Sequence, residues 1–135
     1  MVGIVADKNI EGHVNAILRI LQGDAWRSLW DEMAVRVESF ETLGLGADTP
    51  DDVLWHSCQS NELVLITGNR NEIGDDSLEA TIRRENNARR LPVITLGQPD
   101  RALNDRAYQE KIAAGLLEYL LAIENYRGSG RLYLP

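Results

Sequence analysis

The stretch that most constrains the fold is residues 63–79, where a strand, a polar loop and a helix start follow one another. Its first four residues, 63–66, are all apolar, as is typical of a strand that a parallel sheet buries on both faces. A glycine-containing polar loop comes next, and Asp76 with Glu79 three residues later predicts a capping box that opens a helix. This order places the loop at the carboxyl edge of an open sheet, where such folds bind ligands.

The rest of the chain alternates between strand-like and helix-like patterns. Strands are predicted at 2–6, 34–40, 63–67, 91–96 and 131–134. Helices are predicted at 10–21, after Asp24, from Thr49 with Thr49 as the N-cap, at 77–87 and at 105–126. The alternation predicts one α/β domain over residues 1–135, a three-layer α/β/α sandwich. Its central, mainly parallel sheet would have four or five strands joined by right-handed crossovers.

Composition excludes several classes of protein. The formal net charge of −7 argues against non-specific binding of duplex nucleic acid, which requires clustered Lys and Arg. The single cysteine, Cys58, allows no intrachain disulfide and is expected to be a small buried apolar residue. No secretory leader and no run of about 20 apolar residues is present, so we expect a cytoplasmic protein without a membrane span.

Acidic residues gather near the predicted carboxyl ends of the strands or in the helix starts that follow. They are Asp7, Glu38, Glu41, Asp51, Asp52, Asp75, Asp76, Glu79 and Asp100. Carboxylates brought together raise one another's pKa unless a cation neutralises them, and Mg²⁺ or Mn²⁺ prefers such oxygen ligands. The alternative for each acid is helix capping alone, because free N–H groups and the helix dipole favour acids at helix starts.

Two further groups admit two readings. Asp52 and His56 lie one helical turn apart and could share a metal, although an exposed or hydrogen-bonded histidine is the more common case. The basic pairs 83–84 and 89–90 could contact a phosphate backbone, or form a solvated helix face that pairs with Glu79 and Glu85.

Four segments in order resemble the PIN-like nuclease superfamily. They are Val5-Ala6-Asp7-Lys8-Asn9-Ile10, Thr49-Pro50-Asp51-Asp52, Val64-Leu65-Ile66-Thr67-Gly68-Asn69-Arg70-Asn71 and Leu91-Pro92-Val93-Ile94. They match the "D-x-N" start and the "L-[IV]-T-x-[DN]" third strand of short bacterial PIN-like proteins. The resemblance covers about residues 2–100 and implies a metal-dependent endonuclease, usually one that cleaves RNA, in which Mg²⁺ or Mn²⁺ activates the attacking water.

The resemblance also implies roles for single residues. Asp7, Asp52 and Asp76 would be catalytic, and the metal ligands would be Asp7, Asp52 (less favoured, Asp51), Asn69, Asp75 and Asp76. Candidate contacts to RNA phosphates are Arg70, Arg83 and Arg84. Asn69 stands where many members carry an aspartate, so it would offer a neutral oxygen donor. A cognate antitoxin or another protein partner, and a homodimer, are expected by analogy.

Two other functions compete with the nuclease. One is a PIN-like module that has lost catalysis and binds a partner. The other is a phosphoacceptor signalling domain, which also has a doubly wound sheet of similar length. The latter is disfavoured because the third strand ends in Thr67-Gly68-Asn69 rather than an aspartate, and no lysine follows the fourth or fifth strand.

Overall fold

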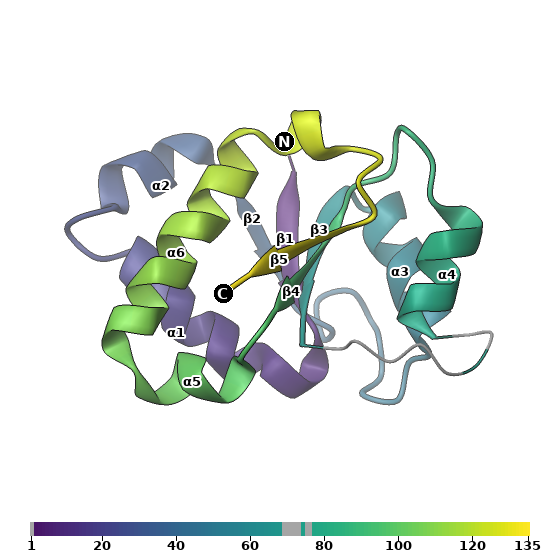
Figure 1. The fold of residues 1–135 in the computed structure, drawn as a ribbon, viewed down its shortest axis with the longest axis horizontal. Helices are drawn as coiled ribbons and strands as arrows, with labels where there is room; N and C mark the ends of the chain where they lie inside the picture. The colour runs from purple at the N-terminus through teal and green to yellow at the C-terminus, as the bar shows by residue number, and fades with distance from the viewer. Residues whose placement is uncertain (1, 69–73, 75–76) are drawn as a thin grey trace.

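A five-stranded sheet, parallel throughout, forms the middle layer of the structure (Figure 1). The computed structural model describes residues 2–68, 74 and 77–135. The strands are β1 (Gly3–Ala6), β2 (Arg36–Glu38), β3 (Leu63–Thr67), β4 (Val93–Leu96) and β5 (Arg131–Leu134), in the spatial order β2-β1-β3-β4-β5. With helices on both faces, this confirms the predicted three-layer α/β/α sandwich, and the fifth strand is parallel like the others.

One face of the sheet is covered by α1 (Glu11–Leu21), α2 (Arg27–Met33), α5 (Pro99–Asn104) and α6 (Arg106–Leu121). A short 3-10 helix, η1 (Lys8–Ile10), leads into α1, and a second, η2 (Ile123–Tyr126), follows α6. Apolar side chains of these helices pack on strand residues such as Ile4, Ile66 and Ile94. Pro99 begins α5 soon after β4, and the sequence patterns did not predict this helix.

The opposite face is covered by α3 (Asp51–Ser60) and α4 (Leu78–Glu85). Its apolar cluster is smaller and is built around Trp55 of α3, Leu78 of α4 and Val5, Leu65 and Val93 of the strands. We refer to this side as the α3/α4 face and to the other as the α1/α6 face. None of the helices within the described ranges is long and apolar enough to cross a membrane.

The connection from β4 to β5 departs from the predicted right-handed crossovers. The first three crossovers are right-handed, but β4 leads to β5 through α5 and α6, which lie on the same face as α1, and this crossover is left-handed (Figure 1). The α3/α4 face beside β5 is already covered by α4, since Arg131 of β5 binds Glu79 of α4. Packing α6 on α1 instead buries Leu134 on the α1/α6 face. Burial therefore outweighs the usual chirality preference here.

Two predicted helix starts are also corrected. Ser77, rather than Asp76, is the N-cap of α4, because its Oγ accepts a hydrogen bond from the Ala80 N–H at 3.2 Å. Pro50, rather than Thr49, precedes the first residue of α3, and the Thr49 hydroxyl donates to the Gly46 carbonyl at 2.7 Å instead of capping the helix. Helix α3 therefore begins at Asp51, and Asp51 and Asp52 are its first two residues.

Candidate active site

A cleft lies at the carboxyl edge of the sheet, between the ends of β1 and β3. β2 lies on one side of β1 and β3 lies on the other, so the strand order reverses between β1 and β3. The cleft has a volume of about 460 Å³. It is lined by Asp7, Lys8, Asn9, Ile10, Phe40, Ala47, Thr49, Asp51, Gly68 and Pro99. The two carboxylates among these residues come from the end of β1 and the start of α3.

Asp7 is held at the edge by β3. Its backbone N–H donates to the Ile66 carbonyl at 2.8 Å, which extends the pairing of β1 with β3 by one residue. Because successive side chains alternate between faces, Asp7 points toward the α3/α4 face, as do Val5 and Thr67. The Thr67 hydroxyl donates to Asp7 Oδ2 at 2.7 Å. One carboxylate oxygen of Asp7 is therefore fixed in position.

The surroundings of Asp7 disfavour its ionised form. Partial burial raises the pKa of Asp7, the hydrogen bonds from the Thr67 hydroxyl and the Lys8 backbone lower it, and the charge of Asp51 raises it further. The net effect is a raised pKa, so the ionised form is disfavoured. Lys8, the nearest lysine in sequence, forms an ion pair with Glu11 at 3.0 Å. A cation placed between Asp7 and Asp51 would offset both the cost of burying the Asp7 charge and its repulsion by Asp51.

Asp51 and Asp52 occupy different surroundings although they are neighbours. Asp51 lines the cleft, and its Oδ2 accepts a hydrogen bond from the Leu78 N–H at the start of α4, at 3.2 Å. Asp52 Oδ1 instead accepts from the Val53 N–H of its own helix at 2.9 Å, and Asp52 does not line the cleft. The sequence favoured Asp52, whereas the structure brings Asp51 together with Asp7.

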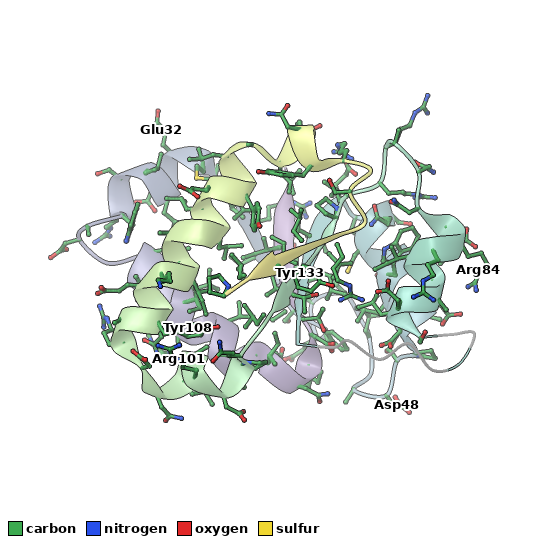
Figure 2. All side chains as sticks on the ribbon, in the orientation of Figure 1. Glu32, Asp48, Arg84, Arg101, Tyr108 and Tyr133 are labelled. Atoms are coloured by element: carbon green, nitrogen blue, oxygen red, sulfur yellow. The ribbon has the colours of Figure 1, made fainter. Side chains whose placement is uncertain are left out.

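The remaining predicted residues divide into two groups. Asn69, Arg70, Asp75 and Asp76 lie outside the described residues. Arg83 and Arg84 lie on the last turn of α4, which begins at the carboxyl edge and runs away from the cleft. They are exposed and lie near acids of the same helix, Arg83 at 3.8 Å from Glu79 and Arg84 at 3.4 Å from Glu85. Figure 2 shows Arg84 on the outer side of the molecule.

Sequence patterns missed a polar row that continues from Asp7 across the α3/α4 face. Thr67 pairs in register with Thr95 of β4, and both side chains are fully buried. The Thr95 hydroxyl accepts a hydrogen bond from Arg131 Nη1 at 2.6 Å, and Arg131 Nη2 donates to Glu79 Oε2 at 2.9 Å. The signal available in the sequence was a threonine near the end of each of the adjacent strands β3 and β4.

The donor set suits a hard divalent cation. Asp7 and Asp51 both offer carboxylate oxygens, and Mg²⁺ is commonly held by one or two carboxylates with water and substrate phosphates completing its shell. Within residues 2–68, 74 and 77–135, no three Asp, Glu, His or Cys side chains gather closely enough to hold a metal ion. The residues present therefore fit an ion held by two carboxylates rather than a closed protein cage.

Cys58 is excluded as a nucleophile. It is buried in the core of the α3/α4 face, and burial raises the pKa of its thiol to about 12. Since the thiolate is the reactive form, Cys58 stays protonated and inert at neutral pH. This agrees with the predicted packing role.

Comparison with known proteins identifies no relative: no family model, no curated protein and no solved structure matches the chain. Membership of the PIN-like superfamily therefore stays a prediction that rests on the quoted sequence segments.

Proposed function

We propose that the protein is a metal-dependent endoribonuclease of the PIN-like type, with Mg²⁺ or Mn²⁺ held by Asp7 and Asp51. The observation that carries the proposal is the meeting of these two carboxylates in one cleft at the reversal point of the sheet. Asp7 and Asp51 are 44 positions apart in the sequence, yet the charge of one raises the pKa of the other. Helix capping alone does not account for Asp7, because it directly precedes η1 but its carboxylate is held by the Thr67 hydroxyl of β3 at 2.7 Å rather than by a cap to that helix.

The chain's own residues would orient the site. The Thr67 hydroxyl holds Oδ2 of Asp7, and the Leu78 N–H holds Oδ2 of Asp51, so each carboxylate keeps one oxygen directed by the protein. The bound ion would supply the charge that activates water and stabilises the leaving oxygen of a phosphodiester. Asn9 and Lys8, which also line the cleft, offer an amide and an ammonium group to the incoming phosphate.

The proposal extends to the setting of the reaction. RNA is the substrate, the protein acts in the cytoplasm, its partner is a cognate antitoxin or another protein, and the chain forms a homodimer. These parts rest on the resemblance and on composition, whereas the placement of the ion rests on the geometry of Asp7 and Asp51.

An RNA-cleavage assay tests the activity. Fluorophore-labelled single-stranded RNA is incubated with metal-stripped protein, with and without Mn²⁺, and with chelator. We expect Mn²⁺-dependent cleavage by the wild type and by Asp52→Asn, and a loss of at least about 100-fold in Asp7→Asn and Asp51→Asn. Cleavage that persists in chelator, or that survives both of the latter substitutions, would overturn the proposal.

A second candidate is a PIN-like interaction module without catalysis. It is favoured by one observation, namely that the described residues bring only two carboxylates into the cleft. The same assay separates the two functions, provided that metal binding is measured alongside it. If the protein neither binds Mn²⁺ nor cleaves RNA, it is the non-catalytic interaction module, and its partner would then be sought.

A further inference from the structure

A basic recess lies at the opposite edge of the sheet from the Asp7–Asp51 cleft, where β4 and β5 begin. Its volume is about 470 Å³, and it is lined by Gln59, Glu62, Asn87, Arg89, Arg90 and Arg127. In Figure 1 the segment after α4 meets the segment before β5 at the upper right, and both segments contribute residues to the recess. Three arginines line it, Arg89, Arg90 and Arg127, against one acid among the described lining residues, although the whole chain carries a net charge of −7. Positive charge is therefore concentrated here against the trend of the protein.

The backbone of Arg89, which is exposed, and of Arg90, which is half-buried, is fixed by hydrogen bonds from the neighbouring segment. Arg127 Nη1 donates to the Arg89 carbonyl at 2.7 Å, and the Gly128 N–H donates to the Arg90 carbonyl at 3.0 Å. Gly128 has a φ of +90°, and a Cβ there would lie 3.3 Å from Ala88 Cα, so this close approach requires glycine. The carbonyl groups of Arg89 and Arg90 are thus bound within the protein, and only the side chains remain for a ligand.

Arg127 is occupied by protein carboxylates. Its guanidinium contacts Glu124 at 2.8 Å and Glu62 at 2.9 Å, and these hydrogen bonds raise its pKa above the ordinary arginine value. The negative charge of Glu62, which is the only acid among the described residues that line the recess, is therefore balanced by Arg127. Arg127 supports the recess, and the net positive charge comes from Arg89 and Arg90.

Arg90 is held in a defined orientation with a donor left over. Its guanidinium lies over the buried ring of Trp55, 5.4 Å from the centroid, which is a cation–π contact. The Arg90 Nε–H is buried and has no hydrogen-bond partner in the described part of the chain. A buried charged donor without an acceptor is costly, and an anion or ordered water usually satisfies it. Arg89 is exposed beside it and makes no side-chain ion pair with any described residue.

We propose that this recess binds a phosphate group, with Arg89 and Arg90 as the contacting residues and Arg127 as the positioning residue. Guanidinium groups bind phosphate oxygens through paired, charge-assisted hydrogen bonds, and the Trp55 ring holds the Arg90 guanidinium in place at the recess. A free phosphate ester and the backbone of a nucleic acid share this chemistry. The site does not depend on the proposed ribonuclease activity, because none of its residues lines the Asp7–Asp51 cleft.

Nuclear magnetic resonance provides a local test. Inorganic phosphate is titrated into ¹⁵N-labelled protein at fixed pH, with chloride at equal ionic strength as the reference, while the Arg90 Nε–H and Trp55 indole signals are followed. We expect phosphate, but not chloride, to shift both signals in the wild type. Arg89→Gln should weaken the response about tenfold, whereas Arg27→Gln, an exposed arginine on α2, should leave it unchanged.

A second arm identifies the source of the phosphate. A ten-nucleotide single-stranded RNA is titrated into the same variants at several salt concentrations. Binding that weakens in Arg89→Gln, with the salt slope reduced by about 0.7, assigns the recess to a nucleic-acid backbone. Shifts with inorganic phosphate alone assign it to a small phosphate ester. Asp7→Asn should bind both probes as the wild type does, which separates this site from the proposed active site.

The proposal is overturned if neither probe moves the Arg90 Nε–H signal beyond the chloride reference. It is equally overturned if Arg27→Gln weakens binding as much as Arg89→Gln, because the effect would then reflect net charge. Thermal melts of each variant accompany the titrations. A loss of stability in Arg89→Gln with unchanged phosphate binding would show that the arginines serve only to complement the nearby helix ends.

Discussion

The α1/α6 face of the sheet is packed with apolar side chains, whereas the smaller α3/α4 face also buries polar ones. The polar residues that are buried as a whole, among the described ones, are Gln59, Thr67, Ser77, Thr81 and Thr95, and the Arg131 side chain is largely buried as well; all belong to elements on or facing the α3/α4 side. On the α1/α6 face, the Tyr108 hydroxyl is buried without a described hydrogen-bond partner, next to Arg101 (Figure 2). The α1/α6 face thus supplies most of the apolar burial, whereas the α3/α4 face also buries polar groups, one of which, Thr67, holds Asp7 at the cleft.

The largest effect on stability is expected from removing apolar volume from the α1/α6 face, which tests whether this face supplies most of the apolar burial. Leu116 of α6 is 1% exposed, and Leu116→Ala should lower the free energy of unfolding by about 2–5 kcal/mol, because it removes buried methyl groups and leaves a cavity. Leu121, the last residue of the same helix, is 58% exposed, and Leu121→Ala should change the free energy of unfolding by less than about 0.5 kcal/mol. Urea unfolding of both variants measures this, and equal effects would contradict the assigned packing.

A smaller effect is expected from the polar row of the α3/α4 face. Thr95→Val keeps the shape but removes the hydroxyl that accepts from Arg131, so we expect a loss of about 2 kcal/mol. Thr81→Val is the matched control, because the Ser77 carbonyl that accepts from the Thr81 hydroxyl still accepts from the Thr81 N–H. That variant should lose less than about 1 kcal/mol. If both cost the same in urea unfolding, the contact between Thr95 and Arg131 adds nothing of its own.

Unlike the substitutions above, replacing Asp7 is expected to raise the free energy of unfolding. Its pKa is raised in the folded state, so the wild type loses stability as the pH rises from the unfolded value of about 3.8 through the folded pKa. In metal-free buffer at pH 7, Asp7→Asn should therefore be more stable than the wild type, by on the order of 1 kcal/mol or less. The difference should vanish near pH 3. Thermal melts across this range test the sign, and a less stable Asp7→Asn at pH 7 would contradict it.

Much of the fold followed from the sequence because buried strands leave a strong local signal. Leu63 to Thr67 is wholly buried in the structure, and the apolar run predicted this. The left-handed crossover was not predictable in the same way, since it depends on which face α6 packs against, a contact between segments far apart in the chain.

The candidate site was predictable only in part. Asp7 follows a strand that the sequence identifies, so its place at the carboxyl edge was expected. The choice between Asp51 and Asp52 depends on which of two adjacent side chains turns toward the cleft, and local pattern favoured the wrong helix start at Thr49. Arg131 was missed because a charged residue in a short terminal strand reads as exposed, whereas only 7% of its side chain is accessible.

The most direct test of the central claim, that Asp7 and Asp51 form one site, is Mn²⁺ binding by calorimetry on metal-stripped protein. We predict that Asp7→Asn and Asp51→Asn each weaken Mn²⁺ binding by at least about tenfold relative to the wild type, and that Asp52→Asn does not. The claim is contradicted if Asp52→Asn weakens binding while Asp51→Asn leaves it unchanged, or if the wild type binds no Mn²⁺ at millimolar concentration.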